Sequence, residues 1–306
     1  MAYTHTAVKT PEQFTAAQDW NAYTEDDHGV WKFLYERQTK LVAMRACAEY
    51  LDGVKQLQLS PDRLPDYRRL NDFMYKSTGW QIAVVPCFIP PELFFELLAK
   101  RHFPATAWIR SKDNLDYLPE PDMFHDVFGH MPMLMDPVYS DYVHEYGKAA
   151  VREVASGHMA ELQRIYWFTI EFGLINSATG PKIYGSGILS SKGESVYCLD
   201  DPTSHQIRFN LKRVMRTTYR IDEYQKTYFV IDSFKQLFDD TMADFKPIYA
   251  ELKNKPTIPW TEIDKDDEII RRGTCEGEPD TTQEDPTLLM ERLNQTRKER
   301  EKKSSS

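Results

Sequence analysis

The sequence predicts a mainly α-helical protein with a minor β-sheet, an α+β fold built as a single domain. Segments that fit helices cover most of the chain, whereas the segments typical of strands are short. No repeat with a period of about 20 to 50 residues and no low-complexity linker divides residues 25–250. We therefore expect one central domain over residues 25–253, an N-terminal extension before it (1–24), and an acidic wrap with a charged C-terminal tail after it (254–306).

The first helix is expected over residues 30–57, where apolar side chains recur at spacings of three, four and seven until Gly53 interrupts the pattern. Further helices are expected at residues 65–76, 91–102, 137–154, 160–174 and 232–252, and short strands at 80–85, 106–110, 182–184 and 227–231. Acidic residues, Gly and Pro are frequent after residue 253 and favour an extended wrap. Residues 287–306 lack the heptads of a coiled coil and are expected to form a solvated tail.

The composition is that of an ordinary globular protein, with 41% hydrophobic and 28% charged residues among 306. The 38 Lys and Arg residues against 47 Asp and Glu give a net charge of −9. This charge argues against a nucleic-acid-binding or membrane-surface protein, because such binding requires a clustered basic face. The four cysteines lack the CxxC spacing of a zinc or redox site, and no apolar run is long enough to span a membrane. We expect a cytoplasmic protein with reduced thiols.

Two histidines, His125 and His130, lie five residues apart among large apolar side chains in the segment PEPDMFHDVFGHMPML. A single histidine in such surroundings is usually a core residue, but a pair suggests metal ligands. Five residues of a straight helix turn by about 500°, or about 140° net, so the two side chains would not share one face. Gly129 and Pro132 predict a bend here that lets His130 swing toward His125.

A single carboxylate, Glu171, lies in the otherwise apolar segment YWFTIEFGL. Because glutamate is seldom buried without a partner, we expect it to face inward toward a divalent cation; an ion pair with Arg164 or Lys182 is the alternative. Two histidines and one carboxylate are the ligands of non-haem Fe(II) oxygenases and also of His₂Glu zinc hydrolases. The hydrolase signature places its histidines four residues apart with Glu after the first, whereas here the spacing is five and Asp126 follows. Composition alone leaves both possibilities open.

Four segments, in this order, resemble the pterin-dependent aromatic amino acid hydroxylases: PEPDMFHDVFGHMPML, YWFTIEFGL, YGSGILSSKGE and YQKTYFVIDSF. The resemblance is greatest to the single-domain bacterial phenylalanine 4-hydroxylases and covers residues 26–249. It implies a mostly helical catalytic domain that binds Fe(II). It also implies a monooxygenase that uses tetrahydrobiopterin and O₂ to convert L-phenylalanine to L-tyrosine.

The resemblance also assigns individual residues. His125, His130 and Glu171 match the iron ligands of the family, in agreement with the residue pattern alone. Arg110 matches the arginine that binds the carboxylate of the amino acid substrate, a task that suits the bidentate guanidinium. Because all four residues are present, the resemblance favours an enzyme over a binding protein that has kept the fold and lost catalysis.

The cofactor residues are assigned by the resemblance alone. Phe94 matches the aromatic residue that stacks on the pterin ring, and the backbone of Cys87, Phe88 and Ile89 matches the loop that binds the pterin edge. Asp126 stands where relatives carry Glu near the pterin, and its shorter side chain implies a bridging water. Further residues match positions along the iron–pterin cleft: Glu120 and Trp167 in catalytic roles, Ser190 beside the substrate, and Tyr166 and Glu194 beside the cofactor. The alternative for Ser190 is a helix cap.

Two positions suggest which aromatic amino acid is the substrate. Trp167 stands where relatives that act on tryptophan carry Phe, and this indole leaves room for a phenyl ring rather than for a second indole. Ile221 stands where tyrosine hydroxylases carry Asp, and it offers no partner to a phenolic hydroxyl. We therefore expect phenylalanine as the substrate, with tryptophan as the alternative and zinc-dependent hydrolysis as a remote one. We expect a monomer, because the chain has no room for the regulatory domain and tetramer-forming coiled coil of animal relatives.

Overall fold

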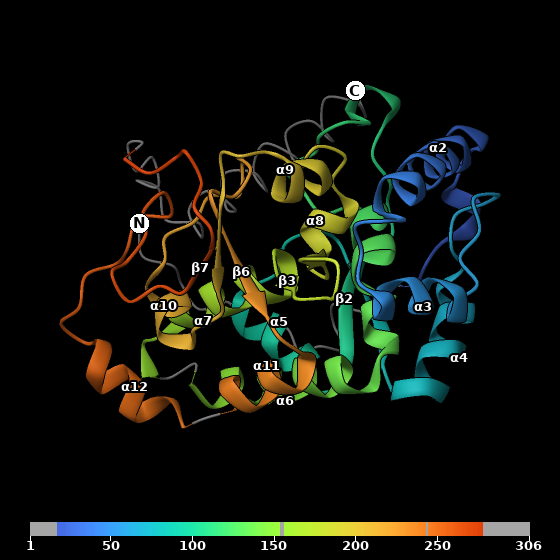
Figure 1. Cartoon of the computed structure of the whole chain (residues 1–306). Helices are drawn as coiled ribbons and strands as arrows, with labels where there is room; N and C mark the ends of the chain where they lie inside the picture. Colours follow the sequence, from blue (N-terminus) through green and yellow to red (C-terminus); the bar gives the residue numbers. More distant parts are fainter. Residues whose placement is uncertain (1–16, 154–155, 243, 278–306) are drawn as a thin grey trace, which may run out of the picture.

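Helices predominate in the structure, a computed structural model that describes residues 17–153, 156–242 and 244–277 (Figure 1). The α-helices are α2 (Glu25–Val42), α3 (Ala48–Gln56), α4 (Tyr67–Thr78), α5 (Pro91–Leu98), α6 (Pro137–Glu153), α7 (Met159–Tyr166), α8 (Ser186–Ser190), α9 (Glu194–Asp200), α10 (Leu211–Arg216), α11 (Phe234–Thr241) and α12 (Phe245–Leu252). Short 3₁₀ turns are η1 (Trp20–Ala22), η2 (Lys112–Asn114) and η4 (Met133–Met135), and π-helices are η3 (Phe124–His130) and η6 (Trp167–Glu171). The expected helix-rich α+β fold is confirmed.

The strands form two small sheets. In the first, β1 (Gln81–Val85) pairs in parallel with β2 (His102–Thr106). The second has the order β4-β3-β6-β5-β7 and contains β3 (Leu174–Ile175), β4 (Lys182–Ile183), β5 (His205–Arg208), β6 (Thr227–Ile231) and β7 (Ile269–Arg271). Its three inner strands are parallel, and β4 and β7 run antiparallel to their neighbours. Helices α6 and α11 pack together below this sheet in Figure 1, and α11 also contacts the fully buried β6.

The helix expected over residues 30–57 is wrong as a single element, because the chain forms α2 and α3 with a break between them. At the break the N–H of Cys47 donates to the carbonyl of Ile183 at 2.9 Å, and the N–H of Ile183 donates to the carbonyl of Arg45 at 2.8 Å. These bonds to β4 occupy backbone groups that a continuous helix would pair internally. Gly53 does not end α3; its missing side chain instead allows close contact with the backbone of Pro132.

The helix expected over residues 232–252 is also divided, into α11 and α12. The side chains of Ser233 and Asp244 accept hydrogen bonds from backbone N–H groups and cap the two helices. Pro247 explains the division, because a proline inside a continuous helix clashes with the carbonyl four residues before it. In the first turn of α12 it meets no such carbonyl, and its missing N–H is a group that no helical bond would use.

Around the first sheet, the helix and the strand have other bounds than the sequence predicts, because β2 pairs with β1. The helix expected to end at residue 102 ends at Leu98, and the strand expected at residues 106–110 is β2, four residues earlier. Arg101 has a φ of 54° and turns the chain between them, so that all five residues of β2 pair with β1. The helix expected over residues 160–174 is α7 followed by η6 and β3. Helices α8, α9 and α10 and strands β3, β5 and β7 have no counterpart among the sequence predictions.

The described residues beyond 253 pack against the rest of the domain. Ile258 forms a parallel bridge with Thr217, Trp260 is fully buried, and β7 extends the five-stranded sheet. The division of the chain at residues 24 and 253 stays a prediction, and the tail expected at residues 287–306 lies outside the described residues. No helix in the described part of the chain is both long and apolar enough to cross a membrane.

The contact between α3 and Pro132 predicts opposite effects for two glycine substitutions. A Cβ at Gly53 would lie 1.9 Å from the carbonyl oxygen of Pro132, whereas a Cβ at Gly29 in α2 would meet no atom within 4 Å. We expect Gly53→Ala to lower the free energy of unfolding by about 1–3 kcal/mol through overpacking. Gly29→Ala should raise it by up to about 1 kcal/mol, because alanine favours the helix. Urea denaturation measures both, and equal effects would contradict the contact.

Candidate active site

Two π-helices place the candidate metal ligands. A π-helix bonds residues five apart, so the five-residue spacing of His125 and His130 in η3 brings their rings together, with the two Nε2 atoms 3.2 Å apart. The bend expected at this point is wrong, because Met131 and Pro132 both have right-handed helical backbone angles. Gly129 serves a different purpose: a Cβ there would lie 2.8 Å from the carbonyl oxygen of Ser186, so glycine allows η3 and α8 to touch.

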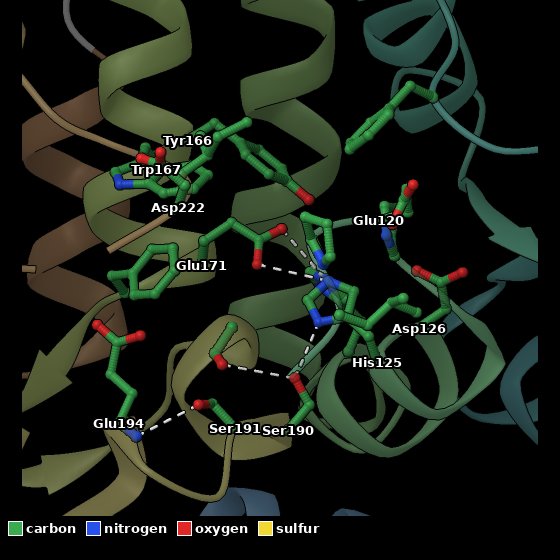
Figure 2. Close-up of a pocket in the computed structure, with 18 of the residues that line it drawn as sticks. Glu120, His125, Asp126, Tyr166, Trp167, Glu171, Ser190, Ser191, Glu194 and Asp222 are labelled. Atoms are coloured by element: carbon green, nitrogen blue, oxygen red, sulfur yellow. Dashed lines mark hydrogen bonds and ion pairs between the residues drawn. The ribbon is translucent and has the colours of Figure 1, made fainter. Parts of the chain in front are cut away.

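The carboxylate of Glu171, at the end of η6, completes this cluster (Figure 2). Its Oε1 lies 3.2 Å from Nε2 of His130, and its Oε2 lies 3.7 Å from Nε2 of His125. Three atoms placed about 2.1 Å from one ion and at right angles would be about 3.0 Å apart, so the three side chains fit a single divalent metal. The alternative ion pair is wrong, because Arg164 and Lys182 donate instead to backbone carbonyls.

The protonation of the cluster suits metal binding. Burial lowers the pKa of His125 to about 4, so its ring is neutral near pH 7. Burial would raise the pKa of Glu171, but the neighbouring His130 and His125 and a hydrogen bond from Tyr166 lower it to about 2. The cluster therefore combines a neutral imidazole with an ionised carboxylate, the forms in which these groups bind metals.

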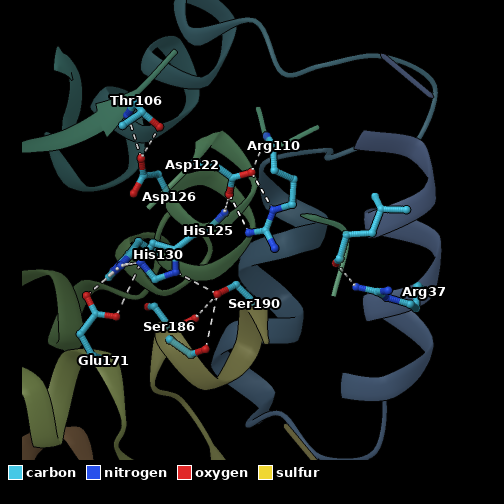
Figure 3. A network of polar contacts seen from close by, with 12 residues as sticks. Arg37, Thr106, Arg110, Asp122, His125, Asp126, His130, Glu171, Ser186 and Ser190 are labelled. Atoms are coloured by element: carbon cyan, nitrogen blue, oxygen red, sulfur yellow. Dashed lines mark hydrogen bonds and ion pairs between the residues drawn. The ribbon is translucent and has the colours of Figure 1, made fainter. Parts of the chain in front are cut away.

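Ser190, the last residue of α8, fixes the orientation of one candidate ligand. Its hydroxyl donates to the carbonyl of Ser186 at 2.9 Å, and its Oγ lies 2.9 Å from Nδ1 of His125. The oxygen therefore accepts the Nδ1–H, which leaves the lone pair on Nε2 for a metal (Figure 3). Ser190 does not cap a helix N-terminus, because Gly193 is the N-cap of α9; it lines the cavity and contacts the candidate metal ligand.

Arg110 is held rigidly by a residue that the sequence analysis did not single out. Its Nε and Nη2 donate to the two oxygens of Asp122, each at 2.8 Å, and its backbone N–H donates to the same carboxylate at 2.9 Å (Figure 3). Asp122 also accepts the backbone N–H of His125 at 3.1 Å. This fully buried carboxylate therefore couples the position of the guanidinium to that of the candidate metal ligand.

Asp126 faces the same cavity from η3. Its Oδ2 accepts the N–H of Thr106 at 2.7 Å and the hydroxyl of Thr106 at 3.0 Å. Burial raises the pKa of Asp126 well above its usual value in spite of these bonds, so a neutral carboxyl group is favoured. Thr106 ends β2, and the first sheet thus supplies the partner of this residue.

Aromatic side chains form the walls of the site. The indole of Trp167 donates to Oε1 of Gln225 at 3.0 Å and stacks on Tyr219 with ring centres 4.6 Å apart. Phe94 meets the ring of Tyr166 edge-on at 5.0 Å. Because two neighbours hold the indole of Trp167, it forms a wall of fixed position.

All the sequence-predicted site residues line one cavity of about 750 Å³. They are Cys87, Phe88, Ile89, Phe94, Arg110, Glu120, His125, Asp126, His130, Tyr166, Trp167, Glu171, Ser190, Glu194 and Ile221. Their polar partners Asp122, Thr106 and Gln225 were not predicted from the sequence. Asp122 lies in the segment that includes both histidines, but nothing in the sequence pairs it with an arginine twelve residues before it.

Comparison with known proteins identifies the family. Residues 12–272 match the family described as biopterin-dependent aromatic amino acid hydroxylase. The chain belongs to this family. It is 50% identical to the phenylalanine-4-hydroxylase of Chromobacterium violaceum over 270 residues, which cover 88% of this chain and 90% of the relative. It is 49% identical to the same enzyme of Ralstonia nicotianae over 268 residues, which cover 88% and 86%.

Solved structures of the Chromobacterium violaceum phenylalanine hydroxylase share the fold of this hydroxylase. One contains iron and phenylalanine and has a TM-score of 0.81 at 49% identity, covering 84% of this chain and 94% of that chain. Another contains iron(III) and 7,8-dihydrobiopterin and has a TM-score of 0.81 at 50% identity, covering 84% and 93%. Membership of this family confirms the recognised resemblance and decides against the zinc hydrolase that the residue pattern alone left open.

The contact between Ser190 and His125 predicts weaker metal binding in Ser190→Ala. Without the hydroxyl the His125 ring loses the partner of its Nδ1, so we expect the dissociation constant of Fe(II) to rise about 10- to 100-fold. Anaerobic titration of the metal-free hydroxylase with Fe(II) measures it. Ser191→Ala is the matched control, because that hydroxyl accepts the backbone N–H of Glu194 instead. Equal affinities of the two variants would contradict the role of Ser190.

The raised pKa of Glu194 predicts that the free energy of unfolding depends on pH. Burial raises its pKa to about 7, against hydrogen bonds from the N–H of Gln225 (2.9 Å) and the hydroxyl of Tyr228 (2.8 Å). In the unfolded chain the carboxyl group loses its proton near its usual value of 4.5. Between these two pH values the unfolded state binds fewer protons than the folded state, so the free energy of unfolding falls as the pH rises.

Glu194→Gln removes this titration while keeping a hydrogen-bond acceptor. We expect the variant to gain stability relative to the wild type as the pH rises from 4.5 to 7, by up to about 3 kcal/mol, and the gain to stay constant above pH 7. Urea denaturation at pH 5 and pH 8 measures it. The control is Glu36→Gln, at an exposed position on α2, whose stability relative to wild type should not change with pH. The raised pKa of Glu194 would be refuted if the difference between Glu194→Gln and wild type were the same at both pH values.

Proposed function

We propose that this protein is a phenylalanine 4-monooxygenase, which hydroxylates L-phenylalanine to L-tyrosine with O₂ and tetrahydrobiopterin at a mononuclear Fe(II). The observation that supports this most directly is that three metal-binding side chains and a fixed guanidinium face one cavity. A volume of about 750 Å³ is sufficient for an amino acid beside a pterin. Relatives named phenylalanine-4-hydroxylase at 41% to 50% identity support the choice of substrate.

His125, His130 and Glu171 would hold the iron, since their donor atoms fit one divalent ion. Three protein ligands leave coordination positions free, as in other non-haem iron oxygenases. When bound, iron and the tetrahydropterin supply the activation of O₂, which no amino acid side chain provides. Ser190 keeps the ring of His125 in the orientation that presents Nε2 to the ion.

Arg110 would bind the carboxylate of the substrate. Asp122 accepts hydrogen bonds from its Nε and Nη2, so Nη1 takes no part in this ion pair. Phe94 and the backbone of residues 87–89 would hold the pterin, with Asp126 at its edge, since all of them line the same cavity as the metal-binding cluster. The aromatic and apolar walls exclude water from the reacting groups.

The wall residues favour phenylalanine over the other aromatic amino acids. Gln225 and Tyr219 fix the indole of Trp167, which leaves less room for a second indole than for a phenyl ring. Ile221 lines the cavity with an apolar side chain and offers no hydrogen bond to the phenolic group of tyrosine. A tyrosine 3-monooxygenase of Caenorhabditis briggsae is a more distant relative, at 32% identity.

The proposal extends to the setting of the enzyme: a monomer in the cytoplasm whose partners are L-phenylalanine, O₂ and a tetrahydropterin, with no nucleic acid or membrane partner. The net charge of −9 supports the absence of a nucleic-acid partner. The four cysteines all lie in the described part of the chain, where they are buried and form no disulfide, which suits a reducing compartment.

Reconstitution tests the proposed reaction. The metal-free protein is loaded anaerobically with Fe(II) or with Zn(II) and then given air, a tetrahydropterin and L-phenylalanine, and tyrosine is measured by chromatography. We expect tyrosine only with iron and pterin together. His125→Ala and Glu171→Ala should abolish it, because each removes one ligand of the cluster. A folded, iron-loaded protein that forms no tyrosine would refute the proposal, and tryptophan would then be the next substrate to test.

A further inference from the structure

We propose that Glu120 binds the ammonium group of the amino acid substrate while Arg110 binds its carboxylate. The inference rests on the proposed function and assigns a specific contact within the same cavity. It makes Glu120 the residue by which the site recognises an α-amino acid rather than any aromatic acid of similar size.

The carboxylate of Glu120 is buried in the cavity wall and has no partner among the described residues. The residue is 4% exposed and lines the cavity (Figure 2). Arg110 lines the same cavity. Its Oε2 is buried and accepts no hydrogen bond, and within the described residues no ion pair involves this side chain. A buried carboxylate normally has a hydrogen-bond donor or a cation beside it, so one that lacks both in a ligand cavity points to a donor on the ligand.

The other buried carboxyl groups of this region differ from Glu120 in this respect. Asp122 accepts hydrogen bonds from a guanidinium, Asp126 from a threonine, Glu171 pairs with a histidine, and Glu194 accepts a tyrosine hydroxyl. Each of these four therefore has a partner within the protein. Glu120 is the carboxylate among the five for which the described residues provide none.

The position of Glu120 relative to Arg110 fits a zwitterion. Asp122, two residues after Glu120, accepts both side-chain and backbone hydrogen bonds from Arg110. Two residues of chain span at most about 7 Å, so the main chain at Glu120 stays close to the arginine clamp. An α-amino acid carries its ammonium and its carboxylate on one carbon atom. A site for such a molecule needs one anion and one cation close together, and Glu120 and Arg110 both line this cavity.

The N–H groups of a pterin are the other possible donors in this cavity. An ammonium group carries a full charge and gains more from a buried carboxylate than a neutral N–H does. Of the residues that would hold the pterin, Phe94 and residues 87–89 belong to α5 and the loop before it, and Asp126 belongs to η3. Glu120 lies two residues before Asp122, the partner of Arg110. These observations favour the substrate as the partner, and the experiment below separates the two.

A thermodynamic cycle tests the contact. It consists of four dissociation constants, those of two proteins for each of two ligands. Wild type and Glu120→Gln, both loaded with Fe(II) and kept anaerobic without pterin, are titrated by calorimetry with L-phenylalanine and with 3-phenylpropanoate, which lacks the amino group. We expect Glu120→Gln to weaken L-phenylalanine binding about 10- to 100-fold, the range for a hydrogen bond between charged groups. Binding of 3-phenylpropanoate should change by less than about threefold. Glu120→Asp, which keeps the charge, should recover part of the lost affinity.

The remaining outcomes overturn the proposal. Equal weakening of both ligands, or no effect on L-phenylalanine, would show that Glu120 does not contact the ammonium group. A weaker affinity for 7,8-dihydrobiopterin with unchanged affinity for L-phenylalanine would assign Glu120 to the pterin instead. The thermal midpoint of Glu120→Gln should equal that of the exposed control Glu36→Gln, and a lower midpoint together with weakened binding of both ligands would indicate a purely structural role.

The cycle measures binding alone, so its result is independent of turnover. If wild-type protein binds L-phenylalanine but forms no tyrosine, the proposed function fails while the contact can still be confirmed. If tyrosine forms and the cycle shows no selective effect, the proposed function stands and the contact at Glu120 is refuted.

Discussion

The burial of several carboxyl groups around one cavity is the constraint on which the rest of this structure depends. Charged carboxylates lose their hydration when they are buried and need compensation nearby. Asp122 obtains it from the guanidinium of Arg110, and Glu171 from two histidines that fit one divalent ion. Burial raises the pKa of Asp126 and of Glu194, which favours their neutral forms. These effects keep the net negative charge of the site low before any ligand binds. The cations proposed to bind there are a metal ion at the cluster of His125, His130 and Glu171, and the ammonium group of the substrate at Glu120.

Local backbone geometry sets the positions of the candidate metal ligands. The two π-helices η3 and η6 carry all three candidate metal ligands, and the wider π turn places residues five apart on one side. Elements that are distant in the sequence then hold η3 in place: α8 through Ser190, and β2 through Thr106. Because each contact involves a different element, the cavity can keep its shape only when the whole domain is folded.

Several features could be predicted from the sequence because their signals are local. The helix-rich fold follows from apolar periodicity, and the metal-binding cluster follows from two histidines and one glutamate in apolar segments. The resemblance to a known family supplied the other predicted site residues, all of which line a single cavity in the structure. The short strands β3, β5 and β7 could not be predicted, because two to four residues carry no periodic signal and form only where a neighbouring strand is present.

The sequence by itself determined the fold class, the family and the residue types that carry the chemistry, since these depend on composition, period and motif. Only the tertiary structure decided how those residues are paired. It showed that a π-helix rather than a bend joins His125 to His130, that Asp122 holds Arg110, and that Glu120 has no partner among the described residues. The physical reason is that hydrogen bonds and ion pairs between distant residues depend on where the backbone brings their atoms, and no local pattern records those distances.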